Sequence, residues 1–242
     1  MSKKAIVVGA SAGVGLAIAE GLAAAGWDLV IGSRNQDDLD ALVAPLVEAG
    51  AGSVTPIAVD VSDDNSLTHF IAQAATNPSA VIITAGSVSA IDEGTTDWAT
   101  TSTLVTNNMT GVMKLAGHYA IEFETADAGT LVLFSSIAAG APRRNNVAYA
   151  AAKAGLESFA GSMQHRLGRS GAAVHLYRLG YVDTRLAQGD LKLKPADPKK
   201  VAARVISGLG GRSRTVFEPR YWSPIVRGLQ ILPSQIYNRL DF

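Results

Sequence analysis

The sequence predicts an α/β fold in which a doubly wound parallel sheet of about seven strands is covered by helices on both faces. Short runs of almost entirely apolar residues alternate with longer stretches of helical periodicity, and strands buried on both faces have this composition. The intervening stretches are long enough for right-handed crossovers, which join parallel strands. The expected strands cover residues 5–8, 29–32, 54–59, 80–84, 130–135, 173–178 and 214–217.

The first strand runs into a glycine-rich turn, and a helix is expected over residues 16–25. Glycines let the backbone turn sharply and approach a ligand closely, while the free N–H groups and positive end of the next helix attract phosphate. This order predicts a site for the pyrophosphate of a dinucleotide, although three glycines can also form an ordinary tight turn. The expected contacts are Gly9, Ser11, Ala12, Gly13, Val14 and Gly15.

The second strand ends at Ser33 and Arg34. An NAD enzyme of this architecture needs an Asp or Glu there, because a carboxylate accepts a hydrogen bond from the ribose 2′-hydroxyl. No acid stands at that place, whereas Ser33 and the guanidinium of Arg34 suit a 2′-phosphate. An arginine after a strand is otherwise a solvated surface residue. The sequence therefore favours NADP(H) as the cofactor.

Small or polar residues also follow the third and fourth strands, at the sheet edge where ligands bind in such folds. Asp60 follows the third strand and is expected to accept a hydrogen bond from an adenine amino group, with Val61 against the ring. A turn or helix-capping role for Asp60 and Ser62 is the alternative. Ala85 and Gly86 follow the fourth strand and are expected beside the cofactor.

Tyr149 and Lys153 stand four positions apart in an alanine-rich helical stretch, so their side chains share one helix face. A nearby cation is expected to lower the pKa of the phenol toward neutral pH, where acid–base catalysis is most effective. Ser136 ends the fifth strand and could donate a hydrogen bond to a carbonyl oxygen as charge builds on it. Taken singly, such a pair is usually an exposed helix flank, and such a serine a turn residue.

In their order and spacing these residues resemble the short-chain dehydrogenase/reductase family, in its short single-domain branch. The resemblance spans nearly the whole chain, and Asn108 to Gly111, Gly180 and Thr184 extend it. It implies one Rossmann-type domain over residues 1–242 that binds NAD(P) and transfers hydride reversibly between nicotinamide and a carbonyl/alcohol pair. The catalytic residues that it implies are Asn108, Ser136, Tyr149 and Lys153.

The resemblance also assigns roles to single residues. Tyr149 would exchange a proton with the substrate oxygen, Lys153 would hold the nicotinamide ribose, and Asn108 would bind a water next to Lys153. Gly180, Val182 and Thr184 would approach the nicotinamide carboxamide.

The chain departs from the family pattern at two positions. Thr84 replaces the usual Asn before Ala85 and Gly86, which leaves a stabilising hydrogen bond in doubt. Leu179 replaces the usual Pro before Gly180, so that the backbone angle is no longer fixed by a ring.

Composition restricts the classes of function. The chain has 242 residues, 21 basic and 21 acidic, and no basic cluster, which argues against nucleic-acid binding. It has no cysteine, and its four histidines lack ligand spacing, so no metal site is expected. The glycine turn interrupts the apolar run near the start of the sequence, so neither a signal peptide nor a membrane span is expected, and a cytoplasmic location is the default.

Substrate identity is less clear from the sequence. Residues 183–197 are expected to form a lid that carries Arg185, Leu186, Leu191, Lys192, Leu193 and Lys194. Arg143 and Arg144 could meet an anionic group or simply be solvated. The apolar segment over residues 222–237 could close a pocket, join an interface, touch a membrane surface or pack in the core.

Together these features predict an NADPH-dependent reductase of ketones or aldehydes, acting on a small molecule as a homodimer or homotetramer. Two alternatives remain open: an NAD-dependent alcohol dehydrogenase, and a regulatory protein that binds a dinucleotide without turnover. The first needs an acid near Ser33, and the second needs a spoiled proton relay.

Overall fold

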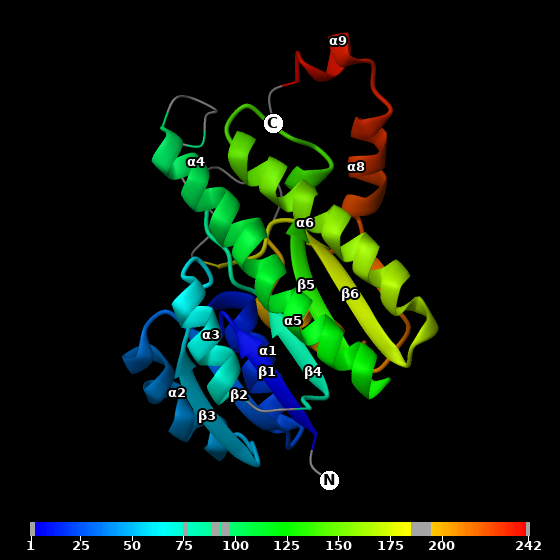
Figure 1. Ribbon diagram of the computed structural model, residues 1–242. Helices are drawn as coiled ribbons and strands as arrows, with labels where there is room; N and C mark the ends of the chain where they lie inside the picture. Colours follow the sequence, from blue (N-terminus) through cyan, green and yellow to red (C-terminus); the bar gives the residue numbers. More distant parts are fainter. Residues whose placement is uncertain (1–2, 75–76, 89–91, 93–96, 185–194, 241–242) are drawn as a thin grey trace.

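The computed structural model describes residues 3–74, 77–88, 92, 97–184 and 195–240. At its centre the described residues form a seven-stranded sheet in the order β3-β2-β1-β4-β5-β6-β7, and each neighbouring pair is parallel (Figure 1). The strands are β1 (Lys4–Val8), β2 (Asp28–Ser33), β3 (Ser53–Ala58), β4 (Ala80–Ile83), β5 (Gly129–Ser136), β6 (Ala172–Leu179) and β7 (Arg214–Glu218).

The predicted doubly wound parallel sheet is therefore confirmed, and each observed strand overlaps its predicted run. The order reverses between β1 and β4, since the chain builds outward from β1 to β3 and then returns to the other side of β1. Ligands bind at such a reversal in open α/β sheets, because the loops that follow the two strands part there. A ligand site is therefore expected at the carboxyl ends of β1 and β4.

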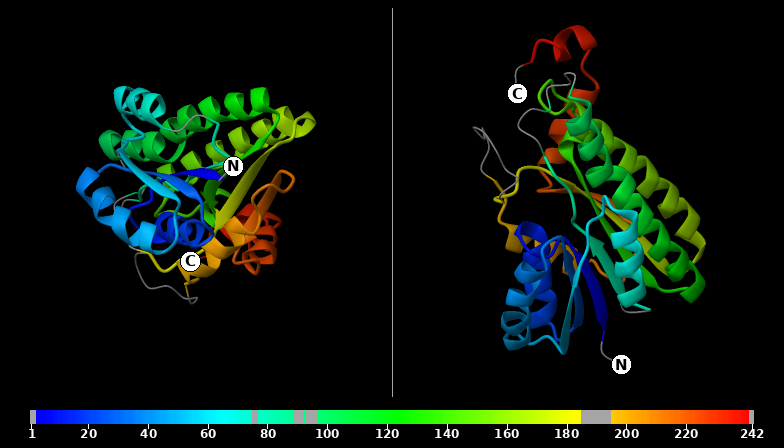
Figure 2. Two further views of the ribbon diagram at one scale, coloured as in Figure 1. Left: turned by 90° about the horizontal axis from the view of Figure 1, so that it is seen from below. Right: turned by 60° about the vertical axis from the view of Figure 1, so that its left-hand side comes forward.

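Helices pack on both faces of the sheet (Figure 2). One face is covered by α3 (Asp64–Gln73), α5 (Gly111–Ala126) and α6 (Val147–Arg166), and the other by α1 (Gly13–Ala24), α2 (Gln36–Glu48) and α7 (Pro198–Ile206). The remaining helical segments are α4 (Trp98–Val105), the π-helical turn η1 (Thr106–Thr110), the 3-10 turns η2 (Ile137–Ala139) and η3 (Leu167–Arg169), α8 (Trp222–Gln230) and α9 (Ser234–Tyr237).

Alternating residues of each strand feed two separate cores. In β1, Ile6 belongs to the cluster that contains Tyr119 of α5, whereas Val7 belongs to the cluster that contains Ile18 and Leu22 of α1. Because successive side chains of a strand point to opposite faces, a strand covered on both sides must be apolar throughout. This requirement explains the short apolar runs from which the fold was predicted.

The first helix begins at Gly13, earlier than the predicted start at residue 16, and ends at Ala24. Glycine disfavours a helix interior, so the pattern alone assigns the glycines to the turn. In the structure Gly13 has φ +58°, and Gly15 lies in the first helical turn against the backbone of Gly9. Packing against β1 decides the helix start here, not intrinsic propensity.

The C-terminal segment extends past the carboxyl ends of the strands (Figure 1). Trp222 and Val226 of α8 are buried with Phe217, and Ile137 and Tyr181 pack against them. For the apolar segment over residues 222–237, packing against the rest of the chain was one of the predicted roles. The structure shows this packing at α8, which contacts the residues that follow β5 and β6. No helix in the described ranges combines the length and apolar character needed to cross a membrane.

Candidate active site

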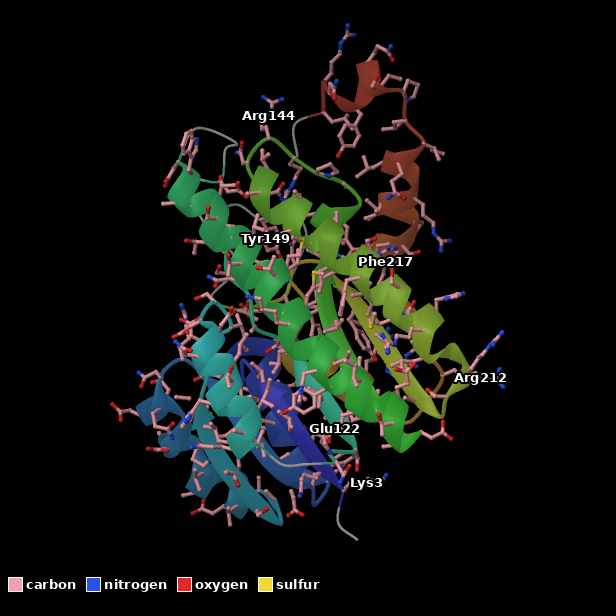
Figure 3. The ribbon with its side chains drawn as sticks, viewed as in Figure 1. Lys3, Glu122, Arg144, Tyr149, Arg212 and Phe217 are labelled. Atoms are coloured by element: carbon pink, nitrogen blue, oxygen red, sulfur yellow. The ribbon has the colours of Figure 1, made fainter. Side chains whose placement is uncertain are left out.

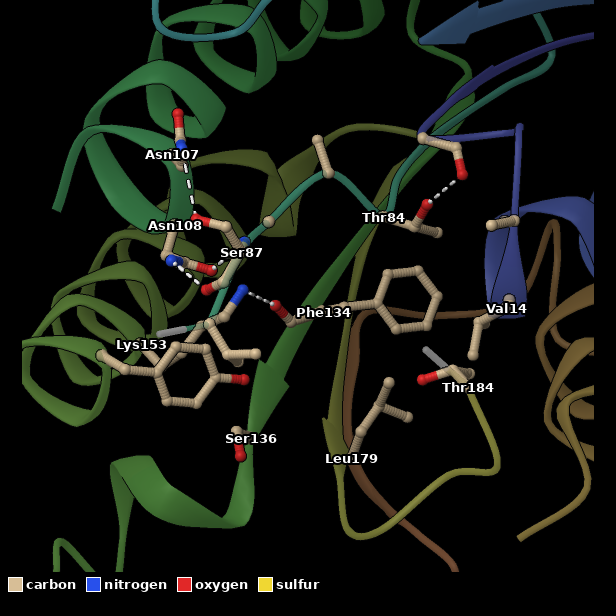
Figure 4. A pocket seen from close by; sticks show the side chains of 18 of the residues that line it. Val14, Thr84, Ser87, Asn107, Asn108, Phe134, Ser136, Lys153, Leu179 and Thr184 are labelled. Atoms are coloured by element: carbon tan, nitrogen blue, oxygen red, sulfur yellow. Dashed lines mark hydrogen bonds between the residues drawn. The ribbon is translucent and has the colours of Figure 1, made fainter. Parts of the chain in front are cut away.

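A cavity of about 880 Å³ lies at the carboxyl ends of the strands (Figure 4). All the predicted catalytic and cofactor-binding residues line it, although they come from segments far apart in the sequence. They are Gly9, Ser11, Ala12, Gly13, Val14, Gly15, Ser33, Arg34, Asp60, Val61, Ala85, Gly86, Asn108, Ser136, Tyr149, Lys153, Gly180, Val182 and Thr184.

The glycine turn between β1 and α1 forms one wall of the cavity. Gly9 has φ +90°, and a Cβ atom there would collide with Thr84 Oγ1. A Cβ atom on Gly15 would collide with the carbonyl oxygen of Gly9. Only glycine therefore lets the start of α1 lie against the end of β1, with the positive end of the helix at the cavity.

Thr84 makes the link that its replacement of Asn had left in doubt. Its hydroxyl lies 3.0 Å from the carbonyl oxygen of Val8 and 3.2 Å from that of Gly9 (Figure 4). A hydroxyl donates one hydrogen, so these two carbonyls share it. The side chain thereby joins β4 to the end of β1 at the point where the strand order reverses.

Polar groups gather at the end of the cavity beside β2 and β3. Ser33 is buried, Arg34 is exposed, and Asp38 of the first turn of α2 adds a carboxylate to the same lining. The residues that end β2 include no acid, as the sequence shows. Asp38 lies further along, in the first turn of α2, and it lines the same cavity. This end thus carries a guanidinium and a carboxylate together.

Asp60 adopts the turn role that was the alternative to adenine binding. Its Oδ1 accepts hydrogen bonds from the backbone N–H of Ser62 at 2.8 Å and from the Ser62 hydroxyl at 2.7 Å. Burial alone would raise the pKa of Asp60, but these hydrogen bonds and the charge of Arg34 outweigh it and hold the pKa below its ordinary value. Asp60 is therefore an anion fixed at the cavity wall.

Tyr149, Lys153 and Ser136 meet at the opposite end of the cavity. The ammonium nitrogen of Lys153 lies 5.8 Å from the centre of the Tyr149 ring, and Ser136 is hydrogen-bonded to the Tyr149 side chain. Lys153 also donates to the carbonyl oxygen of Phe134 at 3.1 Å (Figure 4). Ser136, which ends β5, thus contacts Tyr149, and the carbonyl group of Phe134 in the same strand contacts Lys153.

The pKa prediction for Tyr149 is wrong for the protein alone. Burial raises the pKa of its phenol above the ordinary value, and the hydrogen bond with Ser136 offsets only part of this effect. Burial also lowers the pKa of Lys153 to about 8. Removal of water disfavours both charged forms, and the sequence pattern could not show that Lys153 is buried and Tyr149 partly buried. Tyr149 is therefore a protonated phenol at neutral pH.

Asn108 lies in the π-helical turn η1 and fixes the segment that follows β4. Its Nδ2 donates to the carbonyl oxygens of Ser87 at 2.7 Å and Leu104 at 3.0 Å, and its Oδ1 accepts from the Ser87 N–H at 3.2 Å. A Cβ atom on Gly86 would lie 2.7 Å from Asn108 Oδ1 and 3.5 Å from Lys153 Nζ. Asn108 and Lys153 thus flank Gly86, whereas the water between them stays a prediction.

Asp92 is a buried residue of the lining that the sequence analysis missed. Its carboxylate accepts from the backbone N–H groups of Ala148 and Tyr149, each at 2.9 Å, and its carbonyl oxygen accepts from the N–H of Val147 at 3.4 Å. It therefore caps the first turn of α6, which carries Tyr149. The contact joins residues so distant along the chain that no local pattern could have indicated it.

The remaining expectations concern Arg143, a metal site and the residues that follow β6. Arg143 and Tyr181 line the cavity, and an Arg143 Nη1 donates to the Tyr181 hydroxyl at 3.0 Å. Of the residues that the structure describes, no group of three or more His, Asp or Glu could hold a metal ion. The predicted lid residues Arg185, Leu186, Leu191, Lys192, Leu193 and Lys194 lie outside the described residues.

Comparison with known proteins gives one consistent picture. A family model described as short chain dehydrogenase matches residues 3–193. An uncharacterized oxidoreductase of Mycobacterium tuberculosis is 29% identical over 97% of this chain and 96% of its own length. The cis-4-hydroxycyclohexanecarboxylate dehydrogenase of Sinomonas cyclohexanicum is 29% identical over 88% of this chain and 86% of its own.

Solved structures share the fold. A short-chain dehydrogenase from Sphingobium yanoikuyae in complex with NADPH superposes with a TM-score of 0.82 at 23% identity, over 99% of this chain and 96% of that one. The family model covers well over half of the chain, and the glycine turn, Tyr149 and Lys153 lie within the matched region. This chain therefore belongs to the short-chain dehydrogenase/reductase family, whose members are oxidoreductases that bind a nicotinamide dinucleotide.

Proposed function

We propose that this protein reduces a ketone or an aldehyde to an alcohol with NADPH as the reductant. The observation that carries the proposal is the group of Ser136, Tyr149 and Lys153, which lies in the same cavity as the glycine turn. One relative is named for a hydroxylated ring compound, which fits the alcohol side of such a reaction. The proposal includes one domain over residues 1–242, the roles given above for the site residues, and a preference for NADP(H) over NAD(H).

The lining suits an elongated dinucleotide. Gly9, Gly13 and Gly15 let the start of α1 lie close to the end of β1 at the cavity wall, so backbone N–H groups would meet a pyrophosphate there. Ser33 and Arg34 would hold a 2′-phosphate at one end, and Lys153 would hold ribose hydroxyls at the other. When bound, the cofactor supplies the hydride.

The protein's own groups supply the proton and stabilise the developing charge. A carbonyl oxygen placed between Ser136 and Tyr149 would accept a hydrogen bond from each hydroxyl as negative charge builds on it. The pKa of the Tyr149 phenol lies above its ordinary value, so the phenol is protonated at neutral pH and can donate its proton to the oxygen. The buried ammonium of Lys153 stabilises the resulting phenolate.

Tyr149→Phe tests the proton donor. We expect this variant to lower NADPH oxidation over a panel of ketones and aldehydes by about 10²-fold or more, since general acid catalysis contributes about that factor. Its Kd for NADPH should differ from that of the wild type by no more than about threefold, a difference below 1 kcal/mol. Tyr119→Phe is the matched control, since Tyr119 is also a buried tyrosine but lies in the core. A Tyr149→Phe enzyme with full turnover would contradict the proposal.

The NAD-dependent alternative is favoured by one observation, the carboxylate of Asp38 in the lining. Binding of NADPH and NADH to Arg34→Ala and Asp38→Ala, measured by fluorescence titration, separates the two. We expect Arg34→Ala to weaken NADPH binding about tenfold, or 1.4 kcal/mol, with little effect on NADH. A larger loss of NADH binding in Asp38→Ala than of NADPH binding in Arg34→Ala would assign the enzyme to NAD instead.

A further inference from the structure

The cavity continues past Ser136 into a region that lies beside the site proposed for the nicotinamide. Its wall there is formed by η2 and the loop before α6, and by the residues that follow β6. Ile137 and Tyr181 make it partly apolar, and Arg143 and Asn146 add polar groups. Since Ser136 and Tyr149 border this region, it is the place where a carbonyl compound would lie.

Arg143 is held in this wall by the loop that carries it. Its backbone N–H donates to Asn146 Oδ1 at 3.0 Å, and its carbonyl oxygen accepts from the Asn146 N–H at 3.2 Å. The hydroxyl of Tyr237 donates to the carbonyl oxygen of Pro142 at 2.6 Å, so α9 ties the same loop from outside. The Arg143 side chain then reaches the Tyr181 hydroxyl at 3.0 Å.

The charge of Arg143 has no counterion among the residues that the structure describes. Arg178, which is also partly buried, pairs with Glu157 at 2.6 Å, and the exposed Arg204 pairs with Glu218 at 2.7 Å, whereas the partly buried Arg214 donates to the Tyr177 hydroxyl at 2.8 Å. Among the described residues, the Arg143 side chain donates only to a neutral hydroxyl, although a guanidinium offers five N–H donors. Buried cations are normally paired with an acid, and no acid of the described residues is paired with this partly buried one.

Three acids line the cavity among the described residues, Asp38, Asp60 and Asp92, and none of them is paired with Arg143. The carboxylate of Asp92 accepts the N–H groups of Ala148 and Tyr149. Asp60 is bonded to Ser62, and its charge lies close to Arg34 at the opposite end of the cavity. Among the described residues, the acids of the cavity therefore leave Arg143 without a counterion, which an anionic ligand would supply.

We propose that the carbonyl substrate carries a carboxylate that binds Arg143, so that the enzyme acts on an oxo acid. The planar guanidinium matches a carboxylate through two parallel hydrogen bonds, and one cation suits one negative charge. Ile137 and Tyr181 would contact the apolar body between the carboxylate and the carbonyl. This inference rests on the proposed carbonyl reduction and names its substrate class.

The test compares oxo acids with their methyl esters, which keep the carbonyl and remove the charge. Pairs with different spacings, such as 4-oxocyclohexanecarboxylate, 4-oxopentanoate and their esters, are assayed by NADPH absorbance. We expect kcat/KM to favour at least one acid over its ester by about tenfold or more, as charged hydrogen bonds contribute about 1.5–3 kcal/mol. Arg143→Gln should remove this preference, mainly through KM.

Arg144→Gln is the matched control, because Arg144 is the next residue, is exposed and points away from the body of the molecule (Figure 3). It should keep the preference for the acid. Melting temperatures of both variants, measured with and without NADPH, show whether the fold and the cofactor site are intact. Equal rates for acids and esters, or an unchanged preference in Arg143→Gln, would overturn the proposal.

A calorimetric titration separates this proposal from the proposed activity. If no compound is reduced, the same acids and esters are titrated into the protein in the presence of NADPH. Binding of an acid that Arg143→Gln abolishes and Arg144→Gln retains would support the carboxylate site while carbonyl reduction fails. Absence of acid binding would reject the site, whatever the outcome for turnover.

Discussion

Lys153 is a cation that the fold stabilises poorly when no ligand is bound. It is only 6% exposed, and its ammonium group donates a hydrogen bond to the neutral carbonyl oxygen of Phe134. Burial lowers its pKa from 10.5 to about 8, which corresponds to a cost of roughly 3 kcal/mol for keeping it charged. A side chain that destabilises the fold in this way is expected where function requires its charge.

The cost of burying this charge should appear in the pH dependence of the difference in stability between Lys153→Met and the wild type. The folded-state pKa lies below the unfolded one, so below pH 8 both states are protonated and the folded protein carries the full penalty. Between pH 8 and pH 10.5 the folded state loses its proton first, and stability rises with pH. We expect the variant to be more stable than the wild type at pH 7, by up to roughly 3 kcal/mol.

Urea unfolding of the two proteins from pH 7 to pH 10 measures this difference, and their other titrating groups cancel in the subtraction. The advantage of the variant should shrink as the pH rises through 8. A difference independent of pH would show that the lysine is not destabilised by burial. The variant should also lose carbonyl reduction under the proposed function.

At the scale of elements, α6 depends on a residue from outside the helix. Its N-cap residue Asn146 makes no side-chain capping bond, whereas Asp92 accepts all of the first three helical N–H groups, including that of Tyr149. Capping by one distant carboxylate fixes both the start of the helix and the backbone of the proposed proton donor.

Asp92→Ala should therefore destabilise the protein by about 1–3 kcal/mol, since it leaves buried N–H groups without partners. Turnover should fall as well, because the backbone of Tyr149 loses its anchor. Asp97→Ala is the control, since Asp97 caps α4 through the N–H groups of Ala99 and Thr100 in an exposed setting. It should lower stability less than Asp92→Ala does and leave turnover unchanged. Equal effects of the two variants on turnover would contradict this role for Asp92.

At the scale of the whole molecule, the cavity joins the two halves of the sheet. Its lining includes residues that follow β1, β2 and β3 on one side and β4, β5 and β6 on the other. A ligand that contacts both sides binds only the folded state and must stabilise it. The expected homodimer or homotetramer and the cytoplasmic location stay predictions.

NADPH should therefore raise the free energy of unfolding, by about 2.7 kcal/mol at a concentration one hundred times its Kd. Differential scanning calorimetry against NADPH concentration measures the effect. NADH at the same concentration should raise the melting temperature less, because it lacks the 2′-phosphate that Ser33 and Arg34 would bind. A melting temperature independent of NADPH would exclude binding of this cofactor to the folded protein.

The parts of the structure that could be predicted from the sequence are those with a local signature. A strand buried on both faces must be apolar, and a backbone that crowds another, as at Gly9 and Gly15, must be glycine. Burial and long-range contact leave no such signature. The raised pKa of the Tyr149 phenol and the capping of α6 by Asp92 therefore emerged only in the structure.

The position of Ser136 and Phe134 on one interior strand has a broader consequence. β5 is paired with β4 and β6, so the hydroxyl at its end and the carbonyl that anchors Lys153 keep their spacing as firmly as the sheet keeps its register. Arg143 and Tyr181 instead come from the connections around it. During evolution, such connections can diversify to accept new compounds while the machinery of proton delivery stays intact.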